Sequence, residues 1–259
     1  MANYQLPVGE EFKVPQDKML IGNLLFPRQA KPFQTDAKIT PSQYSLIQDG
    51  NKVIAISTSQ FYNGRNFDEL SQDAIKDGVI IATPRSHLIN WQNVNSALRG
   101  ETPRYNASGR LLETSQVDGE AGVVNHAWVY LNARFPQGSG FRGLDLVTIT
   151  LQNGKPIFTR VPLQPCLEEN CLADVDSMNE QGLLTRKAKT NKYEPGKTVN
   201  FYPPILRQDK PEEGLVARFS ADSGWAGFYC NWGPASRNES LGGFTSAEGA
   251  SVAENGARK

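Results

Sequence analysis

Histidine and cysteine are scarce in this chain, and their scarcity limits the chemistry it can support. The 259 residues include two histidines, His87 and His126, and three cysteines, Cys166, Cys171 and Cys230. Neither histidine has a second histidine or a cysteine at metal-ligand spacing, and the patterns H-E-x-x-H and C-x-x-C are absent. We therefore expect no metal site and no cofactor. Three cysteines without a secretion signal indicate free thiols.

The chain also lacks excess charge, long apolar runs and a secretion signal. Its 27 basic and 27 acidic residues cancel, whereas a dedicated duplex-DNA binder usually carries a basic excess. No apolar run approaches the ~18–20 residues of a membrane span. The first residues, MANYQLPVGEEFKV, contain neither a basic nor an apolar signal region. We expect a cytoplasmic protein that makes no membrane contact.

Short apolar runs separated by turn residues predict a mostly-β or α+β fold with antiparallel sheets built from hairpins. Period-2 alternation at 123–133 predicts one strand. Asn153-Gly154 separates two apolar runs, and this pair favours a two-residue type I′ turn. Turn residues at 49–51 and 221–224 predict two more hairpins. The unit at 123–162 is the best-specified part of the predicted sheet.

Two or three short helices accompany these strands. Asn66, followed three residues later by Glu69, predicts a helix that begins with a capping box and ends near Gly78. Apolar spacing predicts a second helix at 90–98. We expect a third short helix near 172–184, inside a charged segment with few apolar residues.

The predicted domain organisation is one β-rich domain between two extended ends. We expect an extended N-terminal arm at 1–17, a single domain at 18–232, and a disordered tail at 233–259. Residues 100–122 are polar and weakly periodic, which predicts a long loop or a seam between subdomains. Residues 163–196 form a charged surface excursion whose role the sequence leaves open.

The densest aromatic stretch is WAGFYCNWG at 225–233. Strict alternation places Trp225 and Tyr229 on one strand face, and Phe228 and Trp232 on the other. Aromatic residues are enriched at the cores of protein interfaces. We expect these four residues to form an interface, and hence a homo-oligomer. Because catalytic motifs are absent, the first hypothesis is a non-enzymatic binding or assembly protein that self-associates through its arm, its tail and this strand.

The alternative is a sequence-tolerant protein that binds single-stranded nucleic acid. Such proteins stack bases on aromatic rings and follow the phosphates with cations. The glycine-rich segment 135–143 supplies a cationic, aromatic loop that we expect to meet any ligand of the 123–162 unit. The candidate contacts are Phe141, Arg142, Arg160, Arg186, Lys187, Lys189 and Lys192.

A third hypothesis is an enzyme centred on His126. Histidine titrates near neutral pH and can serve as a general base, here beside Asp118 or Glu120. Trp128 and Tyr130 share its predicted strand face. No second catalytic group has support from a motif, so we favour a protein that is not an enzyme.

Overall fold

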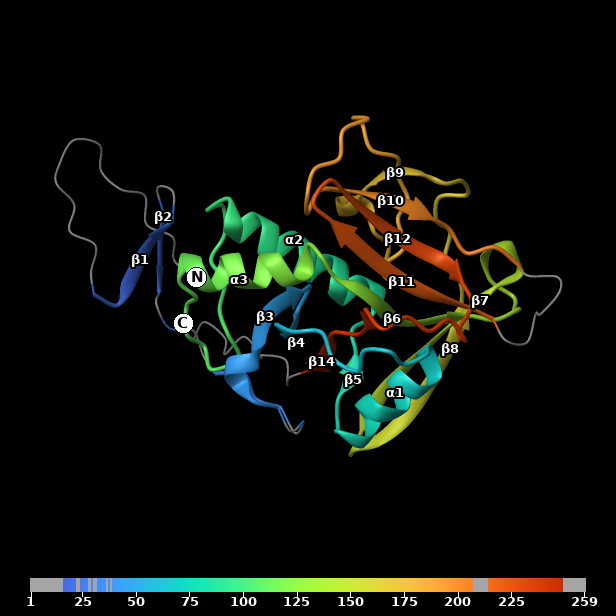
Figure 1. Cartoon of the computed structure of the whole chain (residues 1–259), viewed down its shortest axis with the longest axis horizontal. Helices are drawn as coiled ribbons and strands as arrows, with labels where there is room; N and C mark the ends of the chain where they lie inside the picture. The colour runs from blue at the N-terminus through green and yellow to red at the C-terminus, as the bar shows by residue number, and fades with distance from the viewer. Residues whose placement is uncertain are drawn as a thin grey trace, which may run out of the picture.

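The part of the chain that the structure describes contains two main β-sheets, a separate two-stranded sheet and three α-helices (Figure 1). The computed structural model describes residues 16–21, 24–27, 29, 32–35, 37, 39–206 and 214–248. The predicted mostly-β fold with antiparallel hairpins and short helices is confirmed. Most of the predicted N-terminal arm, at 1–15, lies outside the described residues.

The larger sheet has eight strands in the order β8-β7-β6-β11-β12-β10-β9, with β13 beside the first residues of β6. Neighbouring strands are antiparallel, except for the parallel pairs β10–β12 and β13–β6. The strands are β6 (Trp128–Phe135), β7 (Asp145–Gln152), β8 (Lys155–Pro162), β9 (Cys171–Asp174), β10 (Thr198–Tyr202), β11 (Leu215–Asp222), β12 (Trp225–Trp232) and β13 (Leu241–Gly242).

The smaller sheet is antiparallel and joins strands from both ends of the chain. Its order is β3 (Tyr44–Asp49), β4 (Lys52–Ser57), β14 (Thr245–Glu248) and β5 (Ile80–Ile81). A separate hairpin is formed by β1 (Lys18–Ile21) and β2 (Leu24–Pro27).

The helices are α1 (Phe67–Lys76), α2 (Pro84–Leu98) and α3 (Thr114–Val124). The predicted capping box of α1 is confirmed, since the Glu69 amide donates to Asn66 Oδ1 at 2.9 Å. The second predicted helix begins earlier than expected, because Thr83 caps it and Pro84 suits its first turn. One-turn 3₁₀ helices span Pro41–Gln43, Phe141–Gly143 and Val175–Ser177.

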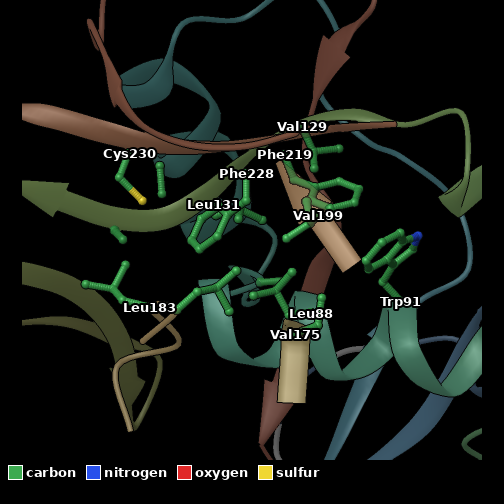
Figure 2. Close-up of a cluster of buried hydrophobic side chains, with 14 of the residues drawn as sticks. Leu88, Trp91, Val129, Leu131, Val175, Leu183, Val199, Phe219, Phe228 and Cys230 are labelled. Atoms are coloured by element: carbon green, nitrogen blue, oxygen red, sulfur yellow. The ribbon is translucent and has the colours of Figure 1, made fainter. Parts of the chain in front are cut away.

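The main core lies on the face of the larger sheet against which α2 packs. Leu88 and Trp91 of α2 meet Val129 of β6 and Phe219 of β11, and all four side chains are buried (Figure 2). The same cluster reaches the smaller sheet through Ile56. We call this the inner face of the larger sheet, and the opposite side the outer face.

The Asn153-Gly154 turn has the predicted backbone. Asn153 has φ 53° and Gly154 has φ 73°, the positive pair that a type I′ turn requires. Gln152 and Lys155 pair directly on either side of it. The turn prediction is confirmed.

The structure overturns three sequence-based predictions about whole segments of the chain. The loop predicted at 100–122 contains α3, because Val117, Ala121 and Val124 give one side of the segment a buried face. The helix predicted near 172–184 is instead β9 and a 3₁₀ turn, because β9 pairs with β10.

The predicted tail also begins too early. Residues 241–247 are buried, and they form β13 and most of β14 inside the two sheets. Residues 249–259 lie outside the described residues.

Candidate functional site

The outer face of the larger sheet carries a group of aromatic side chains that we call the outer aromatic face. The alternation of the paired strands β6, β11, β12 and β10 places these residues on one side of the sheet. Trp128 and Trp232 are 38% and 39% exposed. The members are Trp128, Tyr202, Trp225, Tyr229 and Trp232.

A β-bulge in β12 brings Trp232 to this face. Arg218 pairs with Tyr229, but Val216, two residues earlier in β11, pairs with Trp232, three residues later in β12. The extra residue shifts the alternation by one position. The prediction that Trp232 shares a face with Phe228 is therefore wrong, and Trp232 lies beside Tyr229, with ring centroids 6.3 Å apart and rings perpendicular.

Phe228 is not available as an interface residue. Its side chain is 0% exposed and packs in the inner core, where its ring lies 5.4 Å from that of Phe201. It points away from Trp225 and Tyr229 because successive residues of a strand alternate between faces. Of the four predicted interface residues, Trp225, Tyr229 and Trp232 belong to the outer aromatic face.

The Tyr229 ring packs closely against Gly227, which has no side chain. A Cβ atom at Gly227 would come within 2.5 Å of the Tyr229 ring. The Tyr229 ring also stacks on Tyr202, with centroids 4.4 Å apart and an interplanar angle of 12°. Burial raises the pKa of the Tyr229 hydroxyl, whereas its hydrogen bond with Ser220 lowers it.

The buried side chain of Arg218 contacts an aromatic ring of this face. Its guanidinium carbon is 4.1 Å from the centre of the Trp232 ring and 5.7 Å from that of Tyr130. The residue is 5% exposed, and burial lowers its pKa. Cation–π contacts strengthen when water is excluded. This cation fixes the orientation of the half-exposed Trp232.

Sequence reasoning missed Trp128, Tyr202 and Arg218 as parts of this face. The alternation of Tyr202 with Phe201, which is buried, could have placed Tyr202 on this face. The glycine inside an aromatic strand could have indicated the close packing at Gly227. The role of Arg218 depends on the bulge, which the sequence does not mark.

The predicted nucleic-acid contacts do not form one cationic track with this face. Arg142 is bonded to Glu168, Arg160 to Asp145, Arg186 to Asp174 and Lys187 to Glu169, the first through the backbone oxygen at 2.7 Å. Lys189 and Lys192 are exposed, and Phe141 packs partly against the inner core. Four of the six cations are thus neutralised by carboxylates or held by a carbonyl within the chain.

The glycine-rich loop at 135–143 surrounds a carboxylate of its own chain. Asp145 accepts hydrogen bonds from the Ser139 amide at 2.9 Å and from Arg160 Nε at 2.7 Å. Arg160 and then the Ser139 amide hold the pKa of Asp145 below its ordinary value. A Cβ atom at Gly138 would meet the carboxylate at 2.0 Å. The position that an anionic ligand would take in this loop is already filled.

His126 lies in the connection between α3 and β6, so its predicted position on a strand is wrong. Its Nδ1 is 2.9 Å from the Gly122 carbonyl oxygen, and its Nε2 is 3.9 Å from Asp222 Oδ1. Neither predicted carboxylate partner makes this contact, since Glu120 is buried against Arg104. The imidazole is exposed, and its nearest carboxylate lies beyond hydrogen-bond distance.

The cysteines offer no nucleophile or metal site. Burial raises the pKa of Cys166 to about 12 and also raises the pKa values of Cys171 and Cys230. All three are free thiols, as predicted. Among the described residues, no group of three histidine, cysteine or acidic side chains is placed to hold a metal ion.

A cavity of about 450 Å³ opens on another part of the molecule, between the end of α1, the β7–β8 turn and β14. Its charged side chains are engaged elsewhere. Lys76 binds Asp73 at 3.0 Å, and Tyr62 donates to Asp77 at 2.7 Å. The outer aromatic face is therefore the better candidate for an interaction site.

Comparisons with protein families, curated proteins and solved structures found no match for this chain. No helix within the described ranges is long and apolar enough to cross a membrane.

Proposed function

We propose that this chain is a non-enzymatic binding protein that self-associates through its outer aromatic face. The observation that carries the proposal is the exposure of Trp128 and Trp232 on a face where Arg218 and Tyr202 hold the neighbouring rings in fixed orientations. Rigid, partly exposed aromatic rings are typical centres of protein interfaces.

A protein partner is favoured by the distribution of charge. The cations predicted to follow a phosphate backbone are mostly engaged by groups of the same chain, and Arg218 is buried under Trp232. A second copy is favoured because the chain carries no net charge, which leaves little repulsion between copies at neutral pH.

The test is the mass of the chain in solution, measured by sedimentation equilibrium over a series of concentrations. We expect wild type to exceed its chain mass of 28.6 kDa and Tyr202→Ser combined with Trp225→Ser to move towards it. Leu98→Ser is the matched control, since Leu98 is a 42% exposed apolar residue at the end of α2. A wild type that stays monomeric at every concentration would refute the proposal.

Single-stranded nucleic acid remains the alternative ligand, because flat stacked rings such as Tyr202 and Tyr229 also suit bases. Binding of a labelled oligonucleotide at low salt, weakening as salt rises, would support it. Lys189→Glu combined with Lys192→Glu should then weaken that binding.

Catalysis at His126 is the third candidate. Its test is His126→Gln in a screen for hydrolytic activity. Because the ring is exposed, this change leaves the fold in place and isolates the chemistry of the imidazole.

A further inference from the structure

β8 is the edge strand at one end of the larger sheet, with β9 at the other end, and none of the described strands pairs with the outer side of β8. All eight of its residues are exposed. Phe158 is 66% exposed on one face, and Ile157 and Val161 are 42% and 37% exposed on the other. An apolar edge strand of this length is a template for pairing with another chain.

The turn determines which backbone groups of β8 are free. Gln152 and Lys155 close the two-residue turn and therefore form a hydrogen-bonded pair. Alternation then directs the amide and carbonyl groups of 155, 157, 159 and 161 towards β7, and those of 156, 158, 160 and 162 outwards. Positions 156 and 162 are prolines, which have no N–H group. The outward amides of β8 are thus those of Phe158 and Arg160.

This arrangement is symmetric about Thr159. Pro156 and Pro162 lie three residues to either side of it, and Phe158 and Arg160 lie one residue to either side. We propose that two copies of the chain pair β8 with β8 in antiparallel orientation, with Thr159 opposite Thr159 of the partner subunit. The pairing goes beyond the proposed function and does not depend on the outer aromatic face.

In this register every free amide finds an acceptor. Phe158 exchanges two hydrogen bonds with Arg160 of the partner subunit, and symmetry repeats the exchange. The prolines face each other at both ends, where neither can donate, so the ladder ends there. Ile157 lies opposite Val161 of the partner subunit, which joins the apolar residues on one face.

The side chains disfavour the two neighbouring registers. A shift that centres the pair on Arg160 places two like charges directly opposite each other, which is destabilising. A shift that centres it on Phe158 separates Ile157 from Val161 and places Val161 opposite Lys155 of the partner subunit. The Arg160 guanidinium is directed across β7 to Asp145 and Gln137, which leaves the outer edge open to Phe158 of the partner subunit.

The pairing is short, so a covalent trap is the appropriate test. Standard interfaces bury ~1,600 Å², far more than one eight-residue edge contributes. In a non-hydrogen-bonded antiparallel pair the Cα atoms are about 4.5 Å apart, within the range that a disulfide spans. We expect Thr159→Cys to give a disulfide-linked dimer under mild oxidation, at a yield several-fold above that of wild type with its three native cysteines.

Four further variants decide the register and the mode of contact. Ile157→Cys is the matched control, because its copies lie about 13 Å apart in this register and should not link. Phe158→Cys or Arg160→Cys linking better than Thr159→Cys would overturn the register, and no linkage in any variant would overturn the pairing. Phe158→Pro in the Thr159→Cys background removes an outward amide, leaves the β7 ladder intact and should abolish the linkage.

These measurements are independent of the proposed function. Tyr202→Ser combined with Trp225→Ser should leave the Thr159→Cys dimer unchanged. Phe158→Pro should likewise leave any association through the outer aromatic face unchanged.

Discussion

The imidazole of His87 packs against the ring of Phe219, with ring centroids 4.5 Å apart, and both of its nitrogens are buried without a hydrogen-bond partner among the described residues. The Phe244 ring also lies close, with its centroid 5.5 Å from that of His87. Burial lowers the pKa of His87 to about 3. The histidine therefore serves as a neutral aromatic core residue at neutral pH, and its protonation opposes folding.

His87 should make the stability of the protein fall as the pH is lowered. Between its ordinary pKa of 6.5 and the folded value of about 3, the unfolded state binds a proton that the folded state does not. The effect of His87 on the free energy of unfolding is absent above pH 6.5. Below that pH it lowers the free energy of unfolding by up to about 1.4 kcal/mol per pH unit. His87→Phe should remove this part of the slope in urea denaturation at pH 7, 6 and 5.

The buried ion pair between Arg104 and Glu120 should tolerate joint removal better than separation. Arg104 Nε and the Ser45 hydroxyl both donate to Glu120, and Arg104 Nη2 donates to Asn90 at 2.7 Å. Glu120→Ala leaves a buried guanidinium without its counter-ion, and we expect a loss of about 3–5 kcal/mol. Arg104→Met with Glu120→Leu should recover most of that loss. Denaturant unfolding would contradict this expectation if the double variant were as unstable as the single one.

Asp145 should stabilise the glycine-rich loop only where it is ionised. Its pKa is held below the ordinary value of 3.8, chiefly by Arg160. The stabilisation is therefore complete above pH 3.8 and is lost as the pH falls through the lower folded value. Asp145→Asn should lower the melting temperature at pH 7, and the difference from wild type should shrink in acid.

Gly227→Ala should disturb the outer aromatic face without changing its aromatic composition. The new methyl group would meet the Tyr229 ring at 2.5 Å and force it off the sheet. We expect a stability loss of about 1–3 kcal/mol, weaker self-association and a changed near-ultraviolet circular dichroism spectrum. Gly224→Ala is the matched control, because nothing lies within 4 Å of its added Cβ atom. Unchanged self-association of Gly227→Ala would argue against this face as the contact.

Local signals in the sequence predicted correctly those features that are formed by residues close together in the chain. The type I′ turn at Asn153 and the capping box from Asn66 to Glu69 each depend on residues a few positions apart, and both formed as predicted. The hairpin of β11 and β12 followed from its turn in the same way.

The sequence-based predictions were wrong for segments whose secondary structure depends on contacts with residues distant in the chain. Helix α3 contains Gly119 and Gly122 and has a weak apolar stripe, so its stability comes from the contacts of Val117, Ala121 and Val124. Strand β14 is a stretch of small residues that becomes a strand only between β4 and β5.

The candidate site was predicted in part for a related reason. Alternation identified Tyr229 and Trp225, but the bulge that moves Trp232 is set by the pairing of β12 with β11. A single inserted residue in a strand moves every later side chain to the opposite face of the sheet. No turn residue in the sequence marks such an insertion.

The central place of β14 in the smaller sheet has a consequence for the order of synthesis. Thr245 bonds to Tyr44 across 201 positions, and Ser246 pairs with Ile56. While the chain emerges from the ribosome, the edge of β4 that pairs with β14 therefore stays unpaired until residues 245–248 have been made. The hairpin of β3 and β4 keeps this unpaired edge for that whole interval. A truncated chain that stops before 245 therefore exposes an aggregation-prone edge of β4 and does not form a smaller folded protein.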